Sequence, residues 1–108
     1  MDRVIRVKSW QEFKHLAINL KPESVVYNIE QNGLSPEREL ICLRLIMPAQ
    51  EAYYIFLDFP RKNRLRDTGI PIREDKKGNK YIEDKEVIDF LKTQLERKDL
   101  IVCSYWTI

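Results

Sequence analysis

Two segments of the chain repeat apolar side chains at helical spacing. In residues 10–20 the apolar positions follow one another at intervals of 3, 3, 1 and 3, which at about 100° per residue places them on one face. This face comprises Trp10, Phe13, Leu16, Ala17 and Leu20. His15 is expected on the opposite, solvated side, and Pro22 ends the helix. A second helix is predicted after Asp84, with an apolar face made by Val87, Ile88, Leu91 and Leu95.

Each helix has a candidate N-cap residue. The Ser9 hydroxyl is placed to accept a hydrogen bond from the backbone N–H of Glu12, while the Glu12 carboxylate reaches back to the N–H of Ser9. This reciprocal arrangement is a capping box and predicts that the first helix begins at residue 10. Asp84 is the expected cap of the second helix.

Five further stretches have the pattern of β-strands. They are residues 3–8, 25–30, 40–47, 52–59 and 100–108. Residues 25–30 alternate between apolar and polar positions and predict a half-buried strand, whereas 40–47 and 52–59 are apolar on both faces and predict interior strands. Because a short connection separates these two, we expect an antiparallel hairpin. Residues 100–108 are also apolar on both faces, so we expect this strand inside the sheet rather than at its edge.

The remaining segments complete the order of elements. Residues 60–71 show no periodicity and predict a loop, while residues 70–74 and 80–83 flank a Lys-Lys-Gly-Asn turn and predict a small hairpin. The order is then β-α-β-β-β-(β-hairpin)-α-β. It predicts an α+β fold, a two-layer single domain over residues 1–108 in which a mixed sheet has two helices packed on one face, joined by right-handed β-α-β crossovers.

Composition restricts the class of protein further. The chain has 108 residues and 13.0 kDa, enough for one modest core. With 44% hydrophobic and 33% charged residues, disorder and low complexity are excluded. No run approaches the roughly 20 apolar residues of a membrane span, and the charged N-terminal residues do not resemble a signal peptide. We therefore expect a cytoplasmic protein that does not contact membranes.

The cysteines and the histidine offer little for catalysis or metal binding. Cys42 and Cys103 both lie in apolar runs, which predicts buried, reduced thiols rather than a disulfide. The chain has no CxxC motif, and His15 is its single histidine, so neither a Cys/His metal site nor a cofactor is expected. A nucleophile–histidine pair is also not expected, since His15 is placed on the outer face of its helix.

Positive charge is concentrated in residues 60–80. This stretch holds eight Lys/Arg and three Asp/Glu, a local charge of +5, so the rest of the chain carries −3. Arginines on a loop present planar donor forks that suit phosphate oxygens, and a basic hairpin can enter a groove of nucleic acid. The candidate nucleic-acid-binding residues are Arg61, Lys62, Arg64, Arg66, Lys76, Lys77 and Lys80. The alternative is an ordinary solvated loop.

The same stretch is poor in large apolar side chains, and its charges repel one another. We therefore expect residues 60–80 to be the most mobile part of the free protein and to become ordered when a partner binds. The alternative is a rigid excursion that Ile70 and Ile72 anchor, with Pro71 stiffening the backbone.

Aromatic residues gather on two predicted strands. They are Tyr53, Tyr54, Phe56 and Phe59 on one strand and Tyr105 and Trp106 on the other. Rings on an open sheet face can stack on bases, although rings on strands more commonly pack against the core or against neighbouring strands. Because successive residues point to opposite faces, only half of these rings can face one ligand.

Two carboxylates raise the alternative of a nuclease. The αβββαβ order of residues 9–108 is similar to that of the restriction-endonuclease core, a likeness of topology alone, whose chemistry holds Mg²⁺ on acidic residues of adjacent strands. Asp58 ends one strand and Glu39 begins its neighbour, but neither central strand carries the (D/E)-x-K element. We therefore expect no catalytic activity and expect Asp58 to pair with a nearby arginine.

Arg44 is an unusual residue in an otherwise apolar run. A cation at this position is exposed at an edge, paired, or part of a binding site or subunit interface, and pairing with a carboxylate is favoured. Together these features predict a small non-catalytic protein that binds DNA or RNA with strong salt dependence. The alternative is a protein–protein interaction module, a homodimer or a subunit of a larger assembly, because apolar strands are abundant for so short a chain.

Overall fold

A computed structural model describes residues 2–31, 38–59, 73–78 and 80–105. In these residues the elements are β1 (Arg3–Val7), α1 (Trp10–Leu20), β2 (Ser24–Gln31), β3 (Arg38–Ile46), β4 (Ala52–Leu57), β5 (Arg73–Glu74), β6 (Lys80–Tyr81), α2 (Asp84–Gln94) and β7 (Ile101–Ser104). This is the predicted order of strands and helices. Within the described ranges, neither helix is long and apolar enough to cross a membrane.

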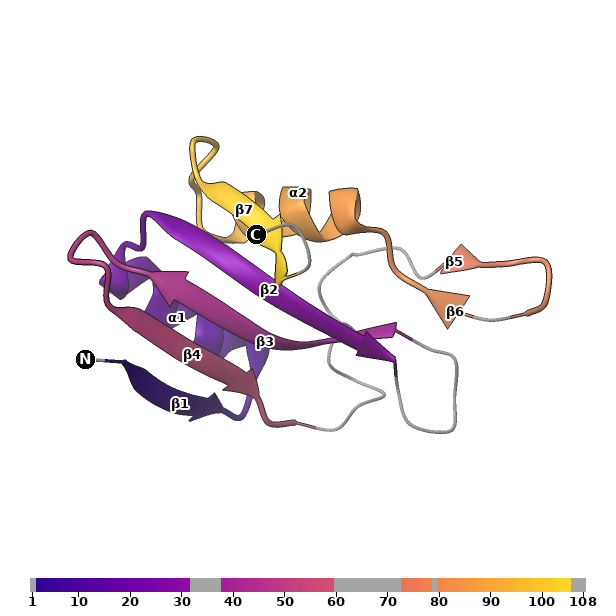
Figure 1. The fold of residues 1–108 in the computed structure, drawn as a ribbon, viewed down its shortest axis with the longest axis horizontal. Helices are drawn as coiled ribbons and strands as arrows, with labels where there is room; N and C mark the ends of the chain where they lie inside the picture. Colours follow the sequence, from indigo (N-terminus) through magenta and orange to yellow (C-terminus); the bar gives the residue numbers. More distant parts are fainter. Residues whose placement is uncertain (1, 32–37, 60–72, 79, 106–108) are drawn as a thin grey trace.

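Five strands form one mixed sheet in the order β1-β4-β3-β2-β7. β3 runs antiparallel to both of its neighbours, while β1 pairs with β4, and β2 with β7, in parallel. The connection from β1 to β2 through α1 and the connection from β4 to β7 through α2 therefore join strands of the same direction. Figure 1 shows both helices behind the sheet, on one of its faces. The predicted two-layer α+β fold is confirmed.

The core lies between the sheet and the two helices. Its buried side chains include Val7, Val25, Tyr27, Leu43, Leu45, Ile55 and Leu57 from the sheet and Phe13, Ala17, Val87, Phe90 and Leu91 from the helices. The ring of Trp10 connects the helices, because its centroid lies 5.0 Å from that of Phe13 and 4.8 Å from that of Phe90. The apolar periodicity thus identified the buried face of α1 and most of that of α2, where it missed Phe90, which is 6% exposed.

The prediction that the last strand lies inside the sheet is wrong. β7 pairs with β2 alone among the described strands and is an edge of the sheet, where Ile101 is 66% exposed. Its apolar residues are divided between the two faces, with Val102 packed against the core. An apolar run on both faces of a strand reports contact above and below the sheet, and it does not report whether both edges of the strand are paired.

The helix N-termini agree with the predictions in part. The Ser9 hydroxyl accepts a hydrogen bond from the Glu12 N–H at 3.1 Å, as predicted. The Glu12 carboxylate, however, accepts from the N–H of Lys8 at 2.9 Å and not from that of Ser9. The predicted cap of the second helix is wrong, because Glu83 occupies the cap position without a side-chain bond. Asp84 instead accepts a hydrogen bond from the Tyr27 hydroxyl at 2.9 Å, which ties α2 to the central part of the sheet.

Candidate nucleic-acid interface

The predicted small hairpin is present and carries two of the candidate lysines. β5 and β6 pair antiparallel, and Figure 1 shows their turn extending beyond the end of the sheet. The Asp75 carboxylate accepts the Lys77 N–H at 2.8 Å, and the Gly78 N–H donates to the Asp75 carbonyl at 3.1 Å. Gly78 has φ +83°, a conformation that favours glycine. The turn leaves Lys76 and Lys77 exposed at the tip of the hairpin.

The base of the hairpin is attached to the second helix. Arg73 pairs with Glu86 and also lies 3.8 Å from Glu83, measured from Nε to Oε1. The hydrogen bond to Glu86, followed by the charges of Glu86 and Glu83, raises the pKa of Arg73 above its usual value. Ile82 directly follows β6 and is buried in the core at 1% exposure, so it anchors the end of the hairpin. Arg73 therefore holds the hairpin in place, and its charge is partly balanced by these two carboxylates.

The structure does not describe the side chains of the remaining candidate residues. Arg61, Lys62, Arg64 and Arg66 lie outside the described residues, and the backbone of Lys80 lies in β6 opposite Glu74. The expected mobility of residues 60–80 also falls largely outside the described ranges and stays a prediction. Of the candidate residues, the structure therefore describes the side chains of Lys76 and Lys77.

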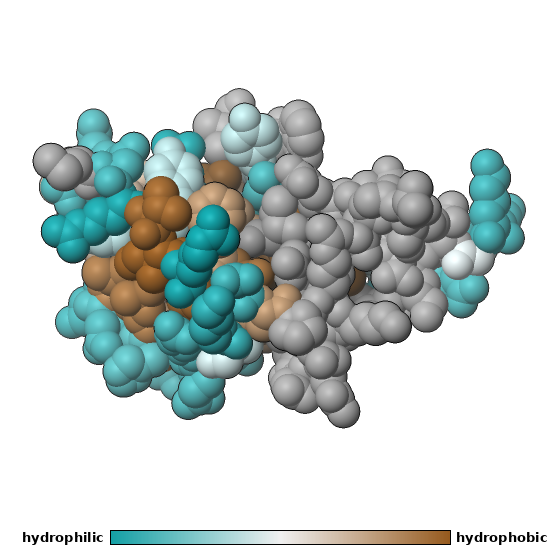
Figure 2. Space-filling view, turned by 90° about the horizontal axis from the view of Figure 1, so that it is seen from below, coloured by the Kyte–Doolittle hydropathy of each residue, from teal (hydrophilic) through white to brown (hydrophobic). Residues whose placement is uncertain are grey.

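The face of the sheet that the helices leave uncovered, called the helix-free face below, is defined by two rows of residues in register. One row contains Val4, Tyr54, Arg44, Val26 and Cys103. The adjacent row contains Arg6, Phe56, Cys42 and Asn28. Figure 2 looks onto the β1 edge of the sheet rather than onto this face, and there the described surface has an apolar area bordered by hydrophilic residues. Val4, at the β1 edge, is 65% exposed.

The structure divides the aromatic residues between the two faces. Tyr53 and Phe59 pack against the core on the helix side, whereas Tyr54 and Phe56 belong to the helix-free face and are half-buried. Tyr105 is 53% exposed, and Trp106 lies outside the described residues. The alternation along a strand predicted that the rings would be divided, but it did not show which of them would face the helices.

Each of the two half-buried rings lies beside an arginine. The guanidinium carbon of Arg44 lies 5.5 Å from the ring centroid of Tyr54, and that of Arg6 lies 5.6 Å from the centroid of Phe56. Among the described residues no carboxylate pairs with Arg44, contrary to the prediction. The Nε of Arg44 is buried and has no hydrogen-bond partner, and the same is true of the Oδ1 of Asn28. An unpaired buried donor and an unpaired buried acceptor thus lie on one face.

For the two carboxylates considered for a nuclease, the structure describes the side chain of Asp58 and only the backbone of Glu39. Asp58 pairs with Lys8, and its N–H donates to the Val7 carbonyl at 2.8 Å. The expected pairing of Asp58 with an arginine stays a prediction. Glu39 lies opposite Glu30 in the strand register. Within the described ranges, no three Asp, Glu, His or Cys residues are grouped as metal ligands would be.

The histidine and the cysteines lie apart from one another. His15 is exposed on α1, as predicted. Cys42 is buried, and this burial raises the pKa of its thiol to about 11, whereas Cys103 is only half-buried. Both are free thiols. β2 lies between their strands, a separation of about 10 Å that exceeds the reach of a disulfide.

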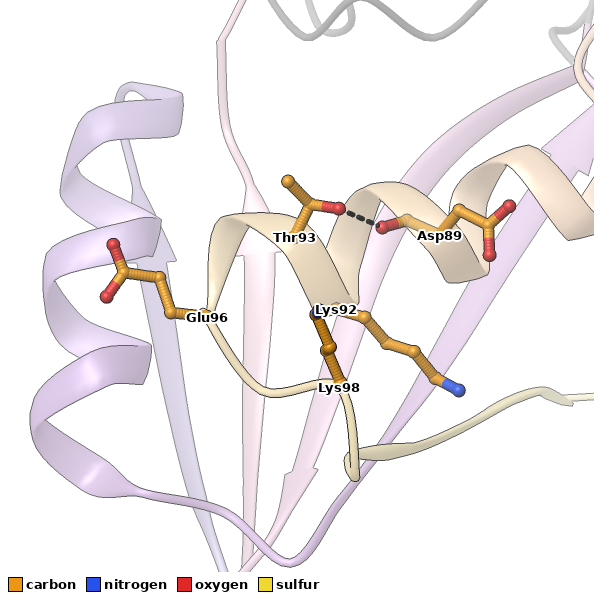
Figure 3. Close-up of a pocket in the computed structure, with 5 residues that line it drawn as sticks. All are labelled: Asp89, Lys92, Thr93, Glu96 and Lys98. Atoms are coloured by element: carbon orange, nitrogen blue, oxygen red, sulfur yellow. Dashed lines mark hydrogen bonds between the residues drawn. The ribbon is translucent and has the colours of Figure 1, made fainter.

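The pocket beside the last turns of α2 does not form a convincing ligand site. Its volume is about 480 Å³, and it is lined by Asp89, Lys92, Thr93, Glu96 and Lys98. The Thr93 hydroxyl donates to the Asp89 carbonyl at 2.8 Å, so it serves the helix backbone. In Figure 3 the carboxylates of Asp89 and Glu96 point in opposite directions. Small-molecule sites need polar groups that converge, and these do not.

Comparison with known proteins assigns the chain to no group. No family model, no curated protein and no solved structure matches it. The function therefore has to be argued from the charges, rings and unpaired polar atoms described above.

Proposed function

We propose that this is a small non-catalytic nucleic-acid-binding protein, which contacts phosphates through the basic loop and hairpin of residues 60–80. The observation that carries the proposal is the position of Lys76 and Lys77. Both are exposed at the tip of the hairpin, and neither has a carboxylate partner among the described residues. The acidic neighbour Asp75 is engaged in the turn.

The sequence adds four cations close to this hairpin. Arg61, Lys62, Arg64 and Arg66 precede it, and the segment as a whole carries +5 in a chain of net charge +2. A concentrated positive segment binds a polyanion even when the net charge of the protein is small, because each neutralised phosphate releases counterions. Such contacts are made to the backbone of the nucleic acid, so we expect weak sequence specificity.

Fluorescence anisotropy with a labelled duplex and a labelled single strand tests this proposal. The logarithm of the binding constant is expected to fall linearly with the logarithm of the salt concentration. Changing Arg61, Arg64 and Arg66 together to Ala removes three phosphate contacts and is expected to reduce the slope by about 2.7. The matched control changes Lys14, Lys85 and Lys92 to Ala, which alters the net charge equally on the helices. Equal losses in the two variants, or no binding at low salt, would contradict the proposal.

A second candidate is a homodimer formed through the sheet. The observation that favours it is the exposure of Val4 and Ile101, at 65% and 66%, on the two edge strands. Exposed edge strands can pair with another chain. Light scattering distinguishes the candidates, because a dimer would show twice the mass of 13.0 kDa without nucleic acid.

A further inference from the structure

We propose that the helix-free face binds single-stranded nucleic acid by stacking its bases on the two arginine–aromatic pairs, Arg44 with Tyr54 and Arg6 with Phe56. The inference rests on the proposed function and adds a second surface to it. The basic segment supplies contacts to phosphates, and the helix-free face supplies contacts to bases.

The positions of the two rings suit the bases of a single strand. Tyr54 and Phe56 are two residues apart on β4 and on the same face, so they are separated by about 7 Å along the strand. This is twice the roughly 3.4 Å between stacked bases of a duplex. Each ring can therefore receive its own base only when neighbouring bases are separated, as single-strand recognition allows.

The shape of the sheet argues against a duplex at this site. Five strands at about 4.8 Å per strand give a surface roughly 20 Å wide. The major groove of a duplex is about 12 Å wide and admits a helix or a two-stranded ribbon. A five-stranded face does not fit into that groove, whereas a single strand of nucleic acid can lie across the sheet face.

The arginines provide planar surfaces as well as charge. Their guanidinium carbons lie 5.5 and 5.6 Å from the ring centroids, which is longer than the contact distance of about 3.5–4.0 Å between carbon atoms. Both rings are half-buried, so part of each side chain remains accessible beside its guanidinium, and guanidinium planes also stack on bases. In the two rows that define this face, the charged residues are Arg6 and Arg44, so the face complements a polyanion.

The unpaired polar atoms favour a base over a phosphate alone. The Arg44 Nε–H is a donor and the Asn28 Oδ1 is an acceptor, and both are buried without partners. The register places the two residues as diagonal neighbours on adjacent strands. Because both atoms are buried, a ligand contacts them only when neighbouring side chains move aside. A phosphate can then satisfy the donor but has no hydrogen for the acceptor, whereas the edge of a base offers both kinds of group.

The test compares three labelled ligands with the full chain: a 12-residue thymidine strand, an abasic deoxyribose-phosphate strand of the same length, and a 12-base-pair duplex. We expect the thymidine strand to bind at least tenfold more tightly than the abasic strand, because stacking of one base changes affinity by about 5- to 150-fold. A duplex that binds more tightly than the thymidine strand would overturn the inference.

The decisive variant is the double change Arg6→Lys and Arg44→Lys, which keeps both charges and removes both guanidinium planes. We expect its preference for the thymidine strand over the abasic strand to fall several-fold, because the rings remain and the guanidinium planes are lost, with abasic binding unchanged. Phe56→Leu removes one of the two rings and should lower the same preference while leaving abasic binding unchanged. The matched control is Arg3→Lys, since Arg3 lies over Tyr53 at 5.9 Å on the helix side of the sheet. A control that loses as much as the double variant would overturn the inference.

The two proposals fail in different ways. If the thymidine and abasic strands bind equally, and both are lost on changing Arg61, Arg64 and Arg66 to Ala, the helix-free face does not bind bases and the proposed function stands. If no strand binds at low salt, both proposals fail. A dimer in light scattering that dissociates in Arg44→Lys would show that a second copy occupies this face, and this result also overturns the inference.

Discussion

Replacing Arg44 with methionine is expected to raise the free energy of unfolding, although it removes a charged residue from an interior strand. The buried Nε–H of Arg44 has no acceptor, and an unpaired buried donor destabilises by about 1–3 kcal/mol. The contact with the ring of Tyr54 stabilises by about 0.5–1 kcal/mol at a partly exposed position. Methionine keeps an unbranched apolar stem and carries no donor. The difference between the midpoints of these ranges predicts a net gain of about 1 kcal/mol.

Urea titration measures this gain, which should appear as a higher midpoint with an unchanged slope. A gain of about 1 kcal/mol corresponds to an increase of about 4–8 °C in Tm for a chain near this size. Arg3→Met is the matched control. Arg3, on the edge strand β1, also lies over a tyrosine ring, that of Tyr53 on β4, but its nitrogens are not among the buried unpaired atoms. It is expected to lose about 0.5 kcal/mol. If Arg44→Met is no more stable than the unchanged protein, the reasoning about the unpaired donor is refuted.

Three further changes test the local structure. Tyr27→Phe removes the 2.9 Å hydrogen bond to Asp84 and should lower the free energy of unfolding by about 1 kcal/mol; an unchanged urea midpoint would contradict this. Lys21→Gly relieves a left-handed residue with φ 52° at the end of α1 and should stabilise by about 0.5–1 kcal/mol, measured by thermal unfolding. In a Cys103→Ser background, a thiol reagent at pH 8 should modify Cys42 about 200-fold more slowly than an ordinary cysteine. Its pKa of about 11 leaves about 0.1% as thiolate, against about a quarter for an ordinary cysteine. The rate should rise about tenfold per pH unit below pH 11, and a rate equal to that of a small free thiol would refute the burial.

Local structure followed from the sequence to a large extent. The helix predicted over residues 10–20 matches α1, and its cap at Ser9 is present, because spacing at 3.6 residues and hydroxyl caps are properties of neighbouring residues. The hairpin that carries Lys76 and Lys77 was predicted for the same reason, since its turn needs a residue such as Gly78 with positive φ. The candidate phosphate contacts could therefore be named from composition and turn signals.

The helix-free face could not be found in this way. β4 is apolar on both sides, so its pattern contains no sign that Tyr53 turns toward the helices and Tyr54 away from them. The pairing of Arg44 with the ring of Tyr54 depends on the register of β3 and β4, which the turn between the strands and the core together establish.

Long-range pairing also explains the two wrong predictions about position. Whether β7 has one neighbour or two depends on strands distant in the sequence, and its own apolar residues are satisfied by contacts above and below the sheet. Asp84 has the residue type of a helix cap, but the hydroxyl of Tyr27 on β2 is its partner. Which segments are helices and which are strands could be predicted, because those preferences act between near neighbours. Strand order, sheet edges and the pairing of side chains across strands could not, because they arise from contacts between residues far apart in the chain.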